Sequence, residues 1–242
     1  IGGPGASGIV GALALNATRA LSLTGNHYSG ASLSFASGNG SPVRFAGGAT
    51  TLNSSAGGID FSGNAIVLAL NTSLTVTTHG GNFSASGGAT GEGNNFLDIN
   101  AGDNAITLGS VGAGISFTRI TLLGSNLTLL GDIYASTGIA SYTGDISSEF
   151  GAGSVVFTGD VIEIRGDLLV LSDDTTSIWI VSQNGALVAG ELGSETRRLA
   201  NAVIGAVAGW VDLGNGSAWI AGDLAIQGNL MVTGEYAATA SA

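Results

Sequence analysis

Residues 219 to 236 read Trp-Ile-Ala-Gly-Asp-Leu, Ala-Ile-Gln-Gly-Asn-Leu and Met-Val-Thr-Gly-Glu-Tyr, three successive hexads with Gly at the same position in each. An acidic or amide residue follows each Gly, and apolar residues flank the pair. The same unit recurs upstream at Gly25, Gly63, Gly131, Gly144, Gly159 and Gly166. Such a repeat predicts one structural unit that is used many times along the chain.

The unit has a simple physical interpretation. Alternating apolar residues predict a β-strand with one buried face, and Gly followed by Asp or Asn tolerates the positive φ of a tight corner. One unit alone buries too little apolar surface to be stable. Stacking the units edge to edge joins their apolar faces into one core, so we predict an all-β solenoid.

The composition agrees with this fold class. The 242 residues are 44% apolar, which is enough for a core. They include 42 Gly and two Pro, which excludes collagen and does not fit a long helical protein. The absence of Cys excludes disulfides, thiolate metal sites and Cys nucleophiles.

The charge balance limits the partners. Seventeen acidic residues face six Arg and no Lys, giving a net charge of −11 that repels phosphate backbones and anionic lipids. We therefore expect neither nucleic acid as a partner nor insertion into a membrane, since no apolar run is long enough to span one. A weakly charged surface of Ser, Thr, Asn and Gly is common in exported bacterial surface proteins. An extracellular or cell-surface location is expected, with any signal peptide already removed.

The chain divides into three expected regions. Residues 1–22 form an N-terminal assembly strand segment, residues 23–193 the β-solenoid, and residues 194–242 a short helix with the terminal hexad strands, which cap the solenoid or take part in assembly. The helix is predicted from Ser194, a candidate N-cap, and from apolar residues on one helical face. Those residues are Leu199, Val203, Ala206, Val207 and Trp210. The alternative for this segment is another pair of strands.

Two resemblances extend this interpretation. Residues 95–112, 120–133 and 141–146, which include Asn-Ala-Gly-Asp-Asn-Ala-Ile-Thr-Leu and Leu-Leu-Gly-Asp-Ile, resemble the degenerate strand repeats of filamentous-haemagglutinin-like and other bacterial surface adhesins. The resemblance covers roughly residues 20 to 175, implies a right-handed parallel β-helix, and favours a small filament subunit. The hexads at about residues 215–236 are instead similar to strand repeats of trimeric bacteriophage tail fibres.

Few motifs indicate specific chemistry. Gly3 to Gly8 matches a dinucleotide-binding pattern, but no strand precedes it and no acidic residue follows at the expected distance. The tripeptide Arg165, Gly166 and Asp167 matches one that integrins recognise, although Gly166 and Asp167 also fit the repeat corner. It is retained as a candidate receptor motif, and cell-surface glycans or a host receptor remain candidate partners.

Metal and cofactor sites have little support. His27 and His79 lack a second ligand at metal-binding spacing. Asp173 and Asp174, followed by two Thr, offer oxygen atoms to Ca²⁺ but lack the spacing of a calcium loop, so a plain turn is favoured. We expect no cofactor, with Ca²⁺ as the open alternative.

An enzymatic role is a second alternative, because parallel β-helices also host polysaccharide-cleaving enzymes. Acid–base catalysis there would need carboxylates gathered near one edge. The candidates are Asp132, Asp145, Asp160 and Asp167. With no Lys and poorly placed Arg to stabilise an anionic transition state, we expect no enzyme activity.

The leading hypothesis is a self-assembling structural protein of an extracellular filament, sheath or matrix fibre, possessing adhesin-like repeats. The open ladder at one end, or an extended terminal segment, would add strands to the next copy. The bacteriophage tail fibre or receptor-binding component is the alternative. The residues expected to make the self-association contact are Ile9, Val10, Leu13, Leu15, Leu21, Leu230, Val232 and Tyr236.

Overall fold

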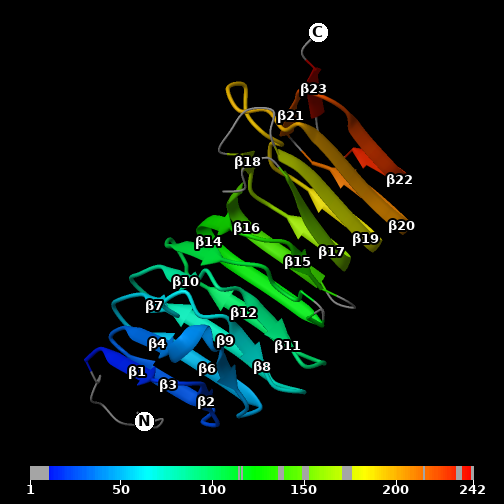
Figure 1. The fold of residues 1–242 in the computed structure, drawn as a ribbon. Coiled ribbons are helices and arrows are strands. Elements are labelled where there is room, and N and C mark those ends of the chain that lie inside the picture. Colours follow the sequence, from blue (N-terminus) through cyan, green and yellow to red (C-terminus); the bar gives the residue numbers. More distant parts are fainter. Residues whose placement is uncertain are drawn as a thin grey trace.

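The computed structural model describes residues 11–113, 115, 117–135, 139–148, 153–170, 176–214, 216–232 and 236–240. They form an elongated parallel β-solenoid in which 64% of the residues lie in strands. The coils stack from β1 (Leu13–Ala17) to β23 (Tyr236–Ala240), and these two strands lie at opposite ends of the solenoid (Figure 1). The predicted all-β parallel solenoid is confirmed.

The described strands follow one another with short corners. They are β1 (Leu13–Ala17), β2 (Leu21–Leu23), β3 (His27–Gly30), β4 (Leu33–Ser37), β5 (Val43–Phe45), β6 (Ala49–Ser54), β7 (Ile59–Asp60), β8 (Ile66–Leu68), β9 (Ser73–Thr78), β10 (Phe83–Ala85), β11 (Ala89–Gly91), β12 (Phe96–Asn100), β13 (Ala105–Leu108), β14 (Arg119–Leu129), β15 (Ile133–Tyr134), β16 (Ile139–Ser148), β17 (Gly153–Ile164), β18 (Leu168–Val170), β19 (Thr176–Val188), β20 (Asn201–Leu213), β21 (Gly216–Ile220), β22 (Leu224–Val232) and β23 (Tyr236–Ala240). A single 3₁₀ turn, η1 (Gly38–Gly40), lies between β4 and β5.

Each coil contributes three strand segments, so the strands form three parallel stacks. One column of paired residues in the first stack is Leu13, Leu33, Ile59, Phe83, Ile106, Leu127, Ile146, Leu168, Leu192 and Ala218. A column of the second stack is Leu21, Val43, Ile66, Ala89, Val111, Ile133, Phe157, Ile180, Ile204 and Ile226. A column of the third is Tyr28, Leu52, Val76, Ile99, Leu122, Tyr142, Ile164, Val188, Leu213 and Val232.

These columns explain the core. Their members in the middle coils, such as Ile59, Ile106 and Ile164, are fully buried because each lies between the same position of two neighbouring coils. In the N-terminal coils the core also contains stacked aromatic rings, with the centroids of Phe35 and Phe61 5.0 Å apart. Burial of one such side chain contributes roughly 1.5–3 kcal/mol.

Glycine has two roles in the repeat unit. Of the upstream repeat glycines within the described residues, only Gly63 has a positive φ, of 78°. At Gly131 the constraint is close approach, because a Cβ would lie 2.6 Å from the backbone nitrogen of Ser110 in the preceding coil. The expected tolerance of positive φ is used at Gly63 and at Gly228, whose φ is 123°, whereas at Gly131 the contact between coils excludes a side chain.

The predicted helix near the C-terminus is also wrong. Residues 201–213 form β20, which pairs in parallel with β19 and with β22. Ala202 and Ile204 point into the core, whereas Val207, on the expected helical face, is 72% exposed. Ser194 and Arg197 form a tight antiparallel bridge instead of beginning a helix. The segment forms a strand because a helix would leave the facing edges of β19 and β22 without hydrogen-bond partners.

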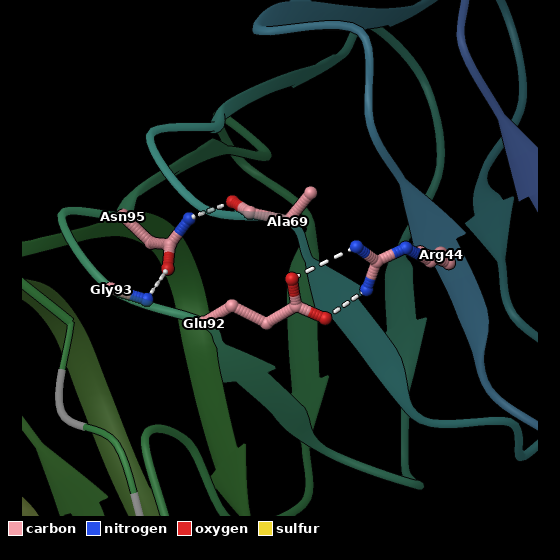
Figure 2. Close-up of polar contacts among 5 residues, drawn as sticks. All are labelled: Arg44, Ala69, Glu92, Gly93 and Asn95. Atoms are coloured by element: carbon pink, nitrogen blue, oxygen red, sulfur yellow. Dashed lines mark hydrogen bonds and ion pairs between the residues drawn. The ribbon is translucent and has the colours of Figure 1, made fainter.

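Buried amides stabilise some corners. Asn95, at the corner between β11 and β12, is fully buried. Its side-chain nitrogen donates to the carbonyls of Ala69 (2.6 Å) and Thr72 (2.9 Å) in the preceding coil. Its side-chain oxygen accepts the N–H of Gly93 at 2.8 Å. The contacts to Ala69 and Gly93 are visible in Figure 2.

We expect Asn95→Ala to destabilise the fold by roughly 2–4 kcal/mol, because it removes three hydrogen bonds and leaves buried groups without partners. Urea unfolding followed by circular dichroism measures the change. Asn16→Ala, at an exposed position of β1, is the control and should change stability by less than about 0.5 kcal/mol. Equal effects of the two substitutions would contradict this account of the corner.

Candidate assembly surfaces

The first described coil leaves one side of its ladder open. β1, β2 and β3 pair with β4, β5 and β6, and within the described residues they have no strand partner on the other side. Leu13, Leu15 and Leu21, three of the expected assembly residues, pack against the core but remain half-buried. Ile9 and Val10 lie outside the described residues.

At the last described coils, inward apolar residues are even more exposed. Leu230 ends a column that includes Leu74, Leu97, Ile120 and Val211, all fully buried. Leu230 occupies the same inward position but is 54% exposed, because no described coil covers it. Leu224 and Ile226, the core residues beside it in β22, are half-buried.

The other expected C-terminal contact residues are only partly described. The backbone of Val232 pairs with Leu213, and that of Tyr236 with Gly216. Their side chains lie outside the described residues. The two strands thus continue the ladder of their own chain.

Sequence reasoning missed further apolar residues near this end. Val207, Trp210 and Met231 are 72%, 37% and 45% exposed. The predicted helix places Val207 and Trp210 on its apolar face. Residues 201–206 do not alternate strictly between apolar and polar, because Val203 lies between Ala202 and Ile204, so the sequence held no clear strand signal here.

The Gly-Asp corners connect neighbouring coils. The carboxylate of Asp132 accepts the N–H of Val156 at 2.9 Å, and that of Asp167 accepts the N–H of Glu191 at 2.8 Å. In each case the partner lies 24 residues later in the sequence, in the following coil. Asp132 and Asp167 are thus acceptors for backbone amides of the following coil.

The receptor motif lies in one of these corners. Arg165 forms an ion pair of 2.9 Å with Glu163, and Asp167 binds the following coil as described above. Gly166 approaches the next coil so closely that a Cβ on Gly190 would lie 2.2 Å from its carbonyl oxygen. Both charged groups of the tripeptide therefore have contacts within the solenoid, which favours its interpretation as a structural corner.

Asp145 and Asp167 precede residues that pair in neighbouring coils, Ile146 and Leu168, but the side chain of Asp145 lies outside the described residues. The other carboxylates considered for catalysis do not gather beside them. Asp132 precedes β15, Asp160 lies at a register shift within β17, and Asp167 precedes β18. Asp160 accepts a hydrogen bond of 2.6 Å from the side chain of Asn184. Among the described residues no group of three or more His, Cys, Asp or Glu could hold a metal ion, and Asp173 and Asp174 lie outside them.

An ion pair spans two coil intervals on the outer surface of the second stack. Arg44 in β5 forms a two-pronged contact with Glu92, which follows β11 (Figure 2). The hydrogen bond from Arg44 lowers the pKa of the Glu92 carboxyl below its ordinary value, and the same contact raises the pKa of Arg44. No helix of the described chain has the length and apolarity needed to cross a membrane.

We expect Asp167→Ala to lower stability by roughly 1–2 kcal/mol, because the N–H of Glu191 loses its acceptor. Asp167→Asn keeps an oxygen acceptor and should lose less. Asp223→Ala changes an exposed Asp that also follows Gly and serves as the control. Thermal unfolding measures the stability of the three variants. A loss of stability in Asp223→Ala equal to that in Asp167→Ala would refute the proposed role of Asp167.

The lowered pKa of Glu92 predicts that its ion pair with Arg44 makes a pH-dependent contribution to folding stability. It is fully present above the unfolded-state pKa of Glu, about 4.3, and is lost as the pH falls through the lower folded-state pKa. Glu92→Gln should therefore lower the melting temperature slightly at pH 7, and the difference from the unmodified chain should disappear in strong acid. A difference that persists unchanged in acid would exclude this ion pair as its cause.

Comparison with known proteins does not identify a family for this chain. No protein-family model, curated protein or solved structure matches the chain.

Proposed function

We propose that the chain is a non-enzymatic structural protein of an extracellular filament, sheath or matrix fibre, whose copies associate end to end. The observation that supports this most directly is the 54% exposure of Leu230 at a position that is fully buried in earlier coils of the same column. Covering one such Leu on association contributes roughly 1.5–3 kcal/mol. The weakly charged, Lys-free composition supports the extracellular location.

The proposed contact is strand addition. The outer edges of β1, β2 and β3 at one end and of β22 at the other present backbone groups without strand partners in the described chain. A second copy placed on either end extends the parallel ladder and covers the half-buried Leu residues. Because the two surfaces differ, the contact is head-to-tail, and when it does not close into a ring it propagates into a fibre.

The two alternatives have less support. Tail-fibre strands would intertwine between three chains, whereas the hexads at 219–236 lie in segments that pair with β20 and with each other in the same chain. A polysaccharide-cleaving enzyme would need adjacent carboxylates, and Asp132 and Asp167 are instead bound to backbone amides at separate corners. Neither alternative is favoured by an observation on the described residues.

The proposal predicts open-ended polymers that depend on the end coils. Leu230→Glu and Leu13→Glu each place a charge in the contact, where its desolvation costs several kcal/mol. Both variants should remain folded, since each position is at the end of the core, but should be monomeric. Light scattering after size exclusion and negative-stain electron microscopy measure the assembly.

Thr107→Glu is the matched control, because Thr107 faces outward from β13 in the middle of the solenoid. It should assemble as the unmodified chain does. A discrete trimer of the unmodified chain would favour the tail-fibre alternative. Fibres of normal length from Leu230→Glu would overturn the proposed contact.

A further inference from the structure

Two shallow hollows adjoin on the outer surface of the third stack, over β9, β12 and β14. The first, of about 230 Å³, is lined by side chains that include Thr75, Thr77, Asp98, Asn100, Thr121 and Leu123. The second, of about 270 Å³, is lined by Thr77, Thr78, His79, Asn100, Asp103 and Asn104, among others. Thr77 and Asn100 belong to both. We call this continuous surface the threonine groove.

The strand register produces the groove. Thr75 pairs with Asp98, and Asp98 pairs with Thr121, while Thr77 and Asn100 pair beside them. Neighbouring coils are about 4.7–4.9 Å apart, so these outward side chains form ladders of hydroxyl, carboxylate and amide groups. The alternate residues of the same strands point inward and form the core.

Several contacts hold the groove's polar side chains in fixed positions. Asp98 forms an ion pair with Arg119, whose Nε lies 3.1 Å from a carboxylate oxygen. The guanidinium also lies 5.2 Å from the centre of the Phe96 ring. Nδ1 of His79 is 2.9 Å from the carbonyl oxygen of Ser54, so Nδ1 is the donor. Such fixed groups lose little conformational entropy when a ligand binds.

The charges and shape of the groove indicate the ligand class. Asp98 and Asp103 line it, Arg119 beside it is already paired with Asp98, and the chain carries a net charge of −11. This arrangement disfavours anionic ligands. Hydroxyl, amide and carboxylate groups in alternation match the hydroxyls of a sugar, and Leu123, 38% exposed, offers an apolar contact. A shallow, open surface cannot enclose a small molecule, but it can follow an extended chain.

We propose that the threonine groove binds a neutral polysaccharide. The inference is independent of end-to-end assembly, because the groove lies on the side of the solenoid. The test is affinity electrophoresis of the full chain in native gels that contain dextran, hydroxyethyl cellulose, galactomannan or dextran sulfate. The chain carries Leu230→Glu, so that any polymerisation does not affect migration. At least one neutral polysaccharide should retard it, and dextran sulfate should not.

Thr77→Arg places a bulky side chain where the two hollows meet and should weaken binding at least tenfold. Thr107→Arg is the matched control, because Thr107 faces outward from β13 in another stack and is also half-buried. It should bind as the parent does. Circular dichroism verifies that each variant is folded. If Thr77→Arg is not folded, the milder double variant Thr75→Ala, Thr121→Ala replaces it and should weaken binding at least threefold.

Three results would overturn the proposal. They are no retardation by any of the three neutral polysaccharides, retardation by dextran sulfate alone, and unchanged binding in the folded groove variant. Failure of fibre formation in the unmodified chain would leave these results unaffected, so the two proposals can fail separately.

Discussion

The parallel hydrogen-bond ladder between successive coils is the constraint on which the rest of the structure depends. The spacing between paired residues of neighbouring coils ranges from 18 residues, for Phe117 and Ala135, to 26 residues, for Leu33 and Ile59. The coil length therefore varies while the pairing is maintained. Because the pairing places the same inward position of every coil in one column, each apolar residue is buried by its counterparts above and below. The core is continuous even though no single coil has one.

The corners absorb the variation in coil length, and they do so with polar groups. At some of them an Asp or Asn side chain accepts a backbone N–H, as Asp132, Asp167 and Asn95 do. The close approach of coils at these points excludes side chains from positions such as Gly131 and Gly190. Gly and Asp are thus adjacent in the repeat for two different reasons, one steric and one a hydrogen bond to the next coil.

The same ladder gives the ends and the sides of the solenoid different properties. At the ends of the described solenoid, inward residues such as Leu13 and Leu230 have a described coil on one side only and remain partly exposed. On the sides, the outward residues of β9 and β12 are already fixed in position by the strands that carry them. An end therefore offers an apolar surface with free strand edges, and a side offers a regular array of polar groups. These two surfaces support the two proposals about assembly and polysaccharide binding.

The fold class follows from the amino-acid pattern alone, because a repeated strand-and-corner unit with period-2 apolar residues can bury its apolar face only by stacking. The sequence also indicated Leu13, Leu15, Leu21 and Leu230 as terminal apolar residues. It did not determine the state of 201–213, because the apolar residues there fit a helical face, and only pairing with β19 and β22 makes them a strand. Nor could it place Thr77 beside Asn100 or Asp167 beside Glu191. Those contacts join residues in different coils, and because coil length varies, only the tertiary structure decides which residues meet.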